Sequence, residues 1–287
     1  MSAESKFQSQ LENATPPNST EEKLSLEKKM GLNYRQAIGE LLYAMVTCRP
    51  DISFPVIKLS QYSLNPSETH YKAVRQLYLY LRATSTDGIY YWRKHPQNTL
   101  PIGDDPFPKP SIYESTFQPT PDIGRLEAGV DATWGNDSEH RKSVSGYALM
   151  LSGGCVLYKT RYQPTVALSS TESEFTAACD AAKSILYVRS ILEEIHIPQP
   201  DATVLYIDNN GALLMANAQQ PTRRTRHLDL KHFAILDWVE RDLVLLSRIA
   251  SPDNFTDGLT KALGRQLHYR HFDRLMGRLK PSYCTAI

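Results

Sequence analysis

The sequence lacks several features that would place it in a familiar class. Its 4 cysteines are widely spaced and form no C-x-x-C pair, which argues against a disulfide framework and a structural zinc site. It has no apolar run of about 18 residues, so we expect no membrane-spanning helix and no membrane partner. The N-terminal stretch MSAESKFQSQ is polar and unlike a signal peptide, so we expect an intracellular location, cytoplasmic or nuclear.

The chain also lacks an excess of charge of either sign. Its 32 Lys and Arg nearly balance its 31 Asp and Glu, and 41% hydrophobic content indicates a globular protein. Because phosphate neutralisation needs Lys and Arg, this average argues against a nucleic-acid partner. Residues 221–287, however, hold 12 basic and 7 acidic side chains, so the average conceals a basic C-terminal region suited to phosphate contacts.

The first part of the chain divides into a polar arm and a helical segment. Residues 1–32 are polar and contain two adjacent prolines, so we expect a flexible arm. Apolar side chains then recur at helical spacing through residues 33–95, which we interpret as one compact, mostly helical unit. We expect three helices and then a strand, at 34–45, 52–59, 67–83 and 88–93.

Residues 96–122 form a proline-rich linker, with seven of the 18 prolines of the chain. Proline removes a hydrogen-bond donor and disfavours helix in the residue before it, so we expect a semi-extended domain boundary. Asp104 and Asp105 lie inside this linker. No aromatic strand precedes them and Pro106 follows, so a solvated linker explains them better than the metal-binding hairpin of a polymerase.

The pattern after the linker predicts an α/β domain over residues 123–265. Three strands come first, and strands and helices then alternate, which is typical of an antiparallel meander followed by crossovers in a mixed sheet with helices on its faces. A final helix is expected to begin near 252, and residues 266–287 are expected to form a basic C-terminal helix and tail. The other expected elements are 126–131, 143–151, 155–158, 169–195, 203–207, 211–218, 225–241 and 243–250.

Three aspartates stand where strands end or a helix begins. Asp131 ends the first strand of this domain and Asp208 follows the fourth, at a sheet edge where α/β folds place ligands. Asp257 is expected in the first turn of the final helix. Each also fits an ordinary cap or turn role, which for Asp257 alone would be the better interpretation.

The helix expected at 169–195 offers a fourth acid. Glu172 lies three residues after Ser169 and fits a capping box, which is a sufficient structural role. Glu174 instead heads the apolar face of the helix, where an acid is usually paired, metal-bound or catalytic. Thr171 and Glu174 also match a capping box, so a structural role stays open, but we choose Glu174 over Glu172.

Four carboxylates at one place repel one another strongly unless a cation lies between them. Oxygen ligands suit hard divalent ions, above all Mg²⁺. Two such ions can activate water and stabilise the leaving oxygen of a phosphodiester. The four acids therefore predict metal-dependent hydrolysis of a nucleic-acid backbone.

Several motifs, in the same order, resemble the ribonuclease H domain of copia-type LTR retrotransposon Pol polyproteins. They are Arg141–Tyr147, Gln163–Phe175, Asp208–Ala212, Arg224–Asp229 and Asp257–Lys261. Upstream, Gly39–Tyr43 and Cys48–Ile52 resemble the segment that follows the reverse transcriptase palm in the same polyproteins. The resemblance covers roughly residues 33–280.

The resemblance implies a ribonuclease H-like fold, in which a thumb- or connection-like helical subdomain precedes a mixed five-stranded sheet with flanking helices. It implies an endonuclease that hydrolyses the RNA strand of RNA–DNA hybrids with two Mg²⁺ or Mn²⁺ ions. The family site carries over to Asp131, Glu174, Asp208 and Asp257. We expect nucleic-acid contacts from the basic residues of the motifs: Arg141, Lys142, Arg223, Arg224, Arg226 and Lys261.

The sequence also departs from the pattern. Thr133 stands where the family often has a second acid, and Leu246–Asn254 lacks the histidine of many cellular ribonucleases H. For His227 and His232, packing at a helix start explains their presence at least as well as catalysis does. There is no Tyr-x-Asp-Asp hairpin, so the polymerase part of a Pol polyprotein is expected as a partner rather than within this chain.

Two other functions fit the same pattern. One is a catalytically inactive nucleic-acid-binding remnant of a retrotransposon polyprotein. The other is a nuclease or transposase of the same broad fold that acts on DNA alone. Assays of hybrid binding, hybrid cleavage and duplex-DNA cleavage distinguish the three.

Overall fold

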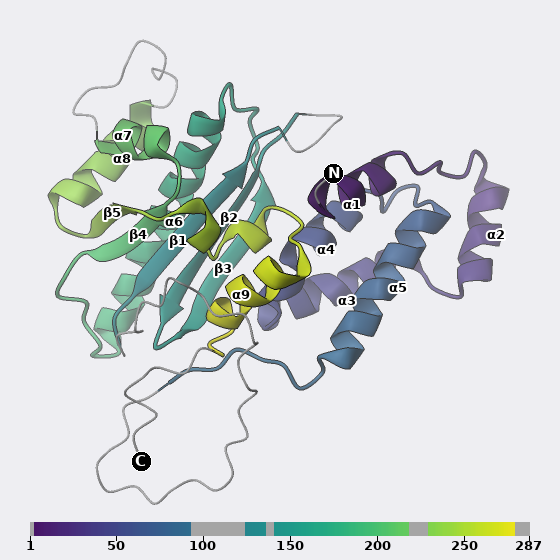
Figure 1. Cartoon of the computed structure of the whole chain (residues 1–287), viewed down its shortest axis with the longest axis horizontal. Coiled ribbons are helices and arrows are strands. Elements are labelled where there is room, and N and C mark those ends of the chain that lie inside the picture. Colours follow the sequence, from purple (N-terminus) through teal and green to yellow (C-terminus); the bar gives the residue numbers. More distant parts are fainter. Residues whose placement is uncertain (1–2, 93–123, 136–140, 218–228, 279–287) are drawn as a thin grey trace, which may run out of the picture.

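A computed structural model describes residues 3–92, 124–135, 141–217 and 229–278 of the chain. A mixed sheet with helices on both faces lies beside a unit made only of helices (Figure 1). Within these described ranges, no helix is both long and apolar enough to cross a membrane. The proline-rich linker expected at 96–122 lies outside the described residues.

The helical unit contains the three expected helices and two more. The five are α1 (Ala3–Glu12), α2 (Thr20–Met30), α3 (Tyr34–Thr47), α4 (Ser53–Ser60) and α5 (Glu68–Ala83). The expected flexible arm is therefore wrong for α1 and α2. Leu11 and Met30 are buried in the core of the unit, and Lys58 donates to Glu12 at 2.9 Å. The N-terminal stretch has too few apolar residues to show a helical periodicity in the sequence. Contacts with the rest of the helical unit order α1 and α2 instead.

The sheet has five strands in the order β3-β2-β1-β4-β5. The strands are β1 (Glu127–Thr133), β2 (Val144–Leu151), β3 (Gly154–Tyr162), β4 (Thr203–Ile207) and β5 (Val244–Arg248). The first three form an antiparallel meander, and β4 and β5 run parallel to β1. The predicted fold class, a mixed five-stranded sheet with flanking helices, is confirmed.

The two faces of the sheet have separate cores because side chains alternate along each strand. Helices α6 (Ser170–Glu194), α7 (Asn210–Asn217) and α8 (Asp229–Glu240) cover one face, where Val130 and Ile207 are fully buried with Phe175. The C-terminal segment covers the other face, where Phe255 and Phe272 pack with Ala148. Asp131, next to Val130, therefore points toward the C-terminal segment.

The C-terminal segment is not the single helix expected from residue 252. It forms two 3₁₀ turns, Ser251–Asp253 (η3) and Asp257–Leu259 (η4), and then α9 (Arg265–Leu275). The Asn254 side chain donates to the Val130 carbonyl oxygen at 3.1 Å and fixes the chain between the two turns. Contacts with the sheet, rather than helical periodicity, therefore decide the path of this segment.

We expected a strand at 88–93. The described part of this stretch is an extended segment that follows the helical unit and packs against the sheet domain. Tyr90 N–H donates to the Met276 carbonyl oxygen at 2.9 Å, and Trp92 N–H donates to that of Ser152 at 2.8 Å. A Cβ atom at Gly154 or Gly277 would collide with the carbonyl oxygen of Tyr90. The strand prediction was wrong because these hydrogen bonds go to a turn and a helix end instead of to a neighbouring strand.

Side-chain hydrogen bonds also hold the two parts together. Tyr158 Oη of β3 donates to the Met45 carbonyl oxygen at 2.5 Å, and Tyr80 Oη lies 3.3 Å from His268 Nε2 of α9. Tyr80 Oη also donates to Asp51 Oδ2 at 2.7 Å. In Figure 1, α9 accordingly lies between the sheet and the helical unit.

Helix α6 depends on its N-terminal cap. Ser169 Oγ accepts a hydrogen bond from Glu172 N–H at 3.1 Å, and the Glu172 carboxylate accepts one from Leu168 N–H at 2.9 Å. Replacing Ser169 by Ala is therefore expected to lower the free energy of unfolding by about 1 kcal/mol. Urea denaturation measures this change. Ser170→Ala is the matched control, and equal losses in the two variants would contradict the capping role.

Candidate active site

Three aspartates from distant parts of the sequence meet at one edge of the sheet. Asp131 lies near the end of β1, Asp208 directly follows β4, and Asp257 begins the η4 turn. Because β1 and β4 are neighbouring parallel strands, their carboxyl ends lie at the same edge. One carboxylate oxygen from each aspartate lies within 4.8 Å of the other two. The structure thus brings together three of the four predicted acids as a compact group.

The η4 turn reaches Asp131 because a glycine stands opposite that residue. Gly146 pairs with Asp131 across β1 and β2, and a Cβ atom there would lie 2.7 Å from atoms of Leu259 and Thr260. Thr260 Oγ1 donates to Asp131 Oδ2, and Thr133 Oγ1 donates to the Thr260 carbonyl oxygen at 3.3 Å. Thr260 was not among our predicted site residues, although it lies within the Asp257–Lys261 motif.

Glu174 approaches the three aspartates from the first turns of α6. Its side chain is almost fully buried, and Oε2 has no hydrogen-bond partner among the residues that the structure describes. Burial first, and then the charges of Asp131 and Asp208, raise the pKa of Glu174 to about 10. Glu172 instead caps the helix, so the structure places Glu174 toward the aspartates and Glu172 at the helix end.

The electrostatics show how crowded the site is. Burial, followed by the charge of Asp131, raises the pKa of Asp257 to about 7. Burial also raises the pKa of Asp131, and the nearby ammonium of Lys261 opposes this shift. Lys261 Nζ lies 3.1 Å from Asp257 Oδ1 and 3.8 Å from Asp131 Oδ2. One ammonium cannot neutralise all four carboxyl groups when they are ionised, so their ionisation requires additional positive charge.

The residues of the site fit a hard divalent metal ion. Its donors are carboxylate oxygens, which Mg²⁺ and Mn²⁺ prefer. Oε2 of Glu174 is a buried polar atom that no group within the described part of the chain satisfies, and such atoms usually have a partner. A cation bound among these oxygens would supply that partner and offset the repulsion.

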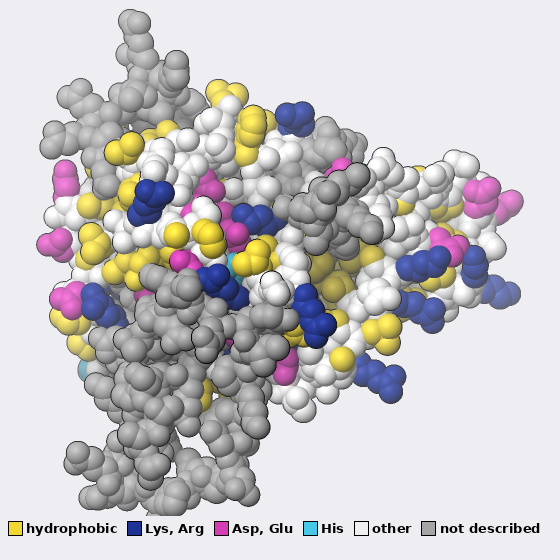
Figure 2. All heavy atoms as spheres, in the orientation of Figure 1, with side chains coloured by type: hydrophobic (Ala, Val, Ile, Leu, Met, Phe, Trp, Pro, Cys, Tyr) yellow, Lys and Arg dark blue, Asp and Glu magenta, His cyan; other side chains and the backbone are white. Residues whose placement is uncertain are grey.

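The predicted nucleic-acid contacts are only partly within the described residues. Arg141 is exposed and Lys142 is partly exposed just before β2. Lys261 turns inward to the aspartates. The other predicted contacts and both histidines lie in a stretch where the structure does not describe side chains: Arg223, Arg224, Arg226, His227 and His232. On the face of the molecule that Figure 2 shows, acidic side chains of the sheet domain have Lys and Arg side chains beside them.

Several arginines of the basic C-terminal region have structural partners. Arg274 lies 3.1 Å from Glu127, and Arg278 lies 2.5 Å from Asp87 and 3.3 Å from Asp273. These two arginines are largely buried at the sheet and at the helical unit. Their charge therefore stabilises the packing of the C-terminal segment and does not contribute to an open phosphate-binding face.

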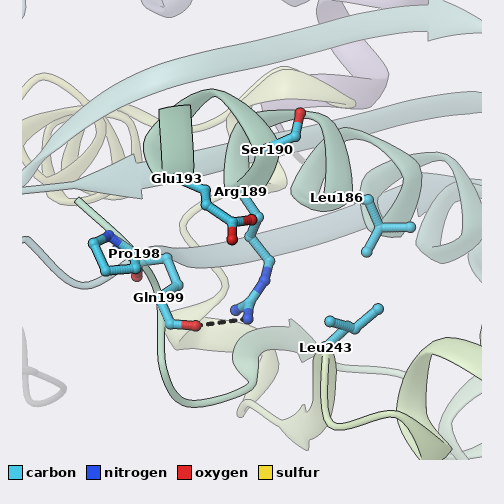
Figure 3. Close-up of a pocket in the computed structure, with 7 residues that line it drawn as sticks. All are labelled: Leu186, Arg189, Ser190, Glu193, Pro198, Gln199 and Leu243. Atoms are coloured by element: carbon cyan, nitrogen blue, oxygen red, sulfur yellow. Dashed lines mark hydrogen bonds between the residues drawn. The ribbon is translucent and has the colours of Figure 1, made fainter. Parts of the chain in front are cut away.

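A separate surface pocket lies at the other end of the sheet (Figure 3). It is formed by the end of α6, the loop that leads into β4, and Leu243. Within it, Arg189 donates to the carbonyl oxygens of Gln199 at 2.7 Å and Asp201 at 2.8 Å. Since this loop precedes β4 and Asp208 follows β4, the pocket is no part of the acidic site, and Arg189 holds the loop in place.

Retrotransposon polyproteins are similar to most of this chain. No family model matches the chain. The retrovirus-related Pol polyprotein from transposon TNT 1-94 of Nicotiana tabacum is 30% identical over 249 residues, which are 87% of this chain and 16% of that protein. The Pol polyprotein from transposon RE2 of Arabidopsis thaliana is 28% identical over 94% of this chain and 17% of its own length. The chain therefore spans about one sixth of these relatives.

Solved structures give a weaker match. The structure of LC11-RNase H1 isolated from compost aligns with 48% of this chain and 94% of its own, with a TM-score of 0.39 and 13% identity.

Proposed function

Because the chain belongs to the family of retrovirus-related Pol polyproteins, we propose that its sheet domain is a ribonuclease H. It would hydrolyse the RNA strand of RNA–DNA hybrids. The observation that carries this proposal is the convergence of Asp131, Asp208 and Asp257 within 4.8 Å at one sheet edge. Glu174 adds a fourth carboxyl group close enough to interact with the charges of Asp131 and Asp208, and its Oε2 has no hydrogen-bond partner within the described residues.

The four acids have distinct proposed roles. Asp131 and Asp208 would hold metal, Glu174 would hold metal and orient water or substrate, and Asp257 would hold a second ion. Two Mg²⁺ or Mn²⁺ ions, when bound, would lower the pKa of water and stabilise negative charge on the leaving oxygen. Hydrolysis adds a water oxygen to phosphorus and breaks the bond from phosphorus to the 3′-oxygen. The products carry a 5′-phosphate and a 3′-hydroxyl.

The remaining parts are proposed to hold the substrate. Basic side chains from the motifs would contact the hybrid backbone and give binding that weakens with salt; they are Arg141, Lys142, Arg223, Arg224 and Arg226, whereas Lys261 faces the aspartates. The helical unit is proposed as a thumb- or connection-like element beside the polymerase part of a Pol polyprotein. We propose that the protein acts in the cytoplasm or the nucleus.

A panel of four labelled substrates tests the proposal: an RNA–DNA hybrid, duplex RNA, duplex DNA and single-stranded RNA. The full chain is expected to cleave only the RNA strand of the hybrid, with Mg²⁺ and not with EDTA. Hybrid binding is measured on the same samples. Binding without cleavage would contradict the enzyme and favour the inactive remnant. Cleavage of duplex DNA would favour a DNA nuclease.

A further inference from the structure

Lys261 contacts the same carboxylates that are proposed to hold metal. Its Nζ atom lies 3.1 Å from Asp257 Oδ1 and 3.8 Å from Asp131 Oδ2. Its side chain is 28% exposed, so the ammonium is partly withdrawn from water. Partial burial strengthens an ion pair relative to one at an open surface.

The backbone fixes Lys261 in this position. Lys261 N–H donates to the Asp257 carbonyl oxygen at 3.1 Å, which places the two side chains one turn apart. The adjacent Thr260 donates its hydroxyl to Asp131. Hydrogen bonds therefore fix the backbone of Lys261 to Asp257 and the side chain of its neighbour Thr260 to Asp131, so the ammonium is kept close to both aspartates.

We propose that Lys261 is a tethered cation that competes with divalent metal ions for the oxygens of Asp131 and Asp257. This inference rests on the proposed function, since it takes the acidic site to be a metal site. A bound ion and the ammonium would place positive charge on the same two oxygens, so each weakens the binding of the other. Lys261 thus sets the metal concentration at which the site fills, and it offsets part of the carboxylate repulsion below that concentration.

Competition differs from the phosphate contact predicted for Lys261 from the sequence. A phosphate contact requires that loss of the ammonium weakens hybrid binding and leaves metal binding in the absence of hybrid unchanged. Competition requires that loss of the ammonium makes metal binding tighter in the absence of hybrid. Metal titration of the full chain without nucleic acid separates the two.

The experiment is calorimetric titration of the full chain with Mn²⁺, at about pH 8.5 so that protons compete less for the carboxylates. The variants are Lys261→Met, which removes the charge, and Lys261→Arg, which keeps it. Lys183→Met is the matched control, because Lys183 is an exposed lysine on α6. Lys261→Met is expected to bind Mn²⁺ at least about fivefold more tightly than wild type, a typical lower limit for coupled sites. Lys261→Arg and Lys183→Met should stay near wild type.

A second measurement uses the wild-type chain and needs no variant to fold. Acetic anhydride labels lysine amines, and mass spectrometry compares Lys261 with Lys183 with and without Mg²⁺. Labelling of Lys261 is expected to rise at least about fivefold on adding Mg²⁺, because metal releases the amine from its ion pairs, while Lys183 should not change. If the wild type binds metal but Mg²⁺ leaves Lys261 labelling unchanged, or Lys261→Met leaves the Mn²⁺ affinity unchanged, the proposed competition is overturned. No Mn²⁺ binding by the wild type would instead overturn the metal site itself.

Discussion

Replacing Asp208 by Asn is expected to lower the rate of hybrid cleavage by roughly a thousandfold, the factor that corresponds to about 4 kcal/mol of lost transition-state stabilisation. The amide has nearly the same size but carries no negative charge, so it holds a divalent ion poorly. Asp208 is only half-buried after the end of β4, so the fold should survive the change. Single-turnover cleavage with Mg²⁺ measures the rate, and circular dichroism checks the fold.

Asp237→Asn is the control for this variant. Asp237 is an exposed residue of α8 that pairs with Arg241 one turn later, so the same chemical change occurs far from the acidic site. Its cleavage rate should match the wild type. Equal rates for the Asp208 and Asp237 variants would remove Asp208 from the proposed mechanism.

Replacing Glu174 by Gln is expected to stabilise the protein in EDTA while abolishing cleavage. Burial, together with the charges of Asp131 and Asp208, raises the pKa of Glu174 from 4.5 to about 10. At neutral pH the unfolded chain gains from ionising this group and the folded chain does not, so the wild-type residue costs stability. Gln avoids that cost, and we expect a gain on the order of 1 to 3 kcal/mol at pH 7 in urea denaturation.

The sign of this effect gives a pH dependence. An acid whose pKa is raised on folding takes up a proton, so its stability cost is absent below about pH 4.5 and grows as the pH rises toward about 10. The stability difference between Glu174→Gln and wild type should therefore be near zero at pH 4 and increase to neutral pH. Mg²⁺ should reduce the difference, since a bound ion stabilises the wild-type carboxylate.

Glu172→Gln is the matched control two residues earlier on the same helix. The Glu172 side chain accepts a hydrogen bond at the helix cap, and a glutamine oxygen accepts it as well. This variant should keep wild-type activity and wild-type stability at pH 7 in EDTA. A gain in stability at Glu172 and none at Glu174 would reverse our assignment of the two acids.

The sheet and the acids on it were predictable from sequence because their signals are local. Asp131 lies near the end of one buried apolar strand and Asp208 follows another, and parallel strands bring such ends together. The preference for Glu174 over Glu172 depended on which face of α6 is apolar, which helical periodicity reveals. In the structure, Glu174 lies close enough to interact with the charges of Asp131 and Asp208, and Glu172 caps the helix.

The C-terminal segment was not predictable in the same way. Its turns follow from contacts of Asn254 with β1 and from the space that Gly146 leaves for Leu259 and Thr260. Such contacts join residues more than a hundred positions apart, so no local pattern reports them. The inward position of Lys261 follows from the same packing, which is why sequence alone assigned it only to nucleic acid.

We infer that this acidic site cleaves RNA paired with DNA. The most direct test incubates the full chain with Mg²⁺ and a hybrid labelled on its RNA strand, beside the Asp131→Asn variant. We expect RNA fragments that carry 5′-phosphates with the wild type and none above the EDTA background with the variant. A hybrid that is bound but uncut by the wild type, or cut equally by both proteins, would contradict this inference.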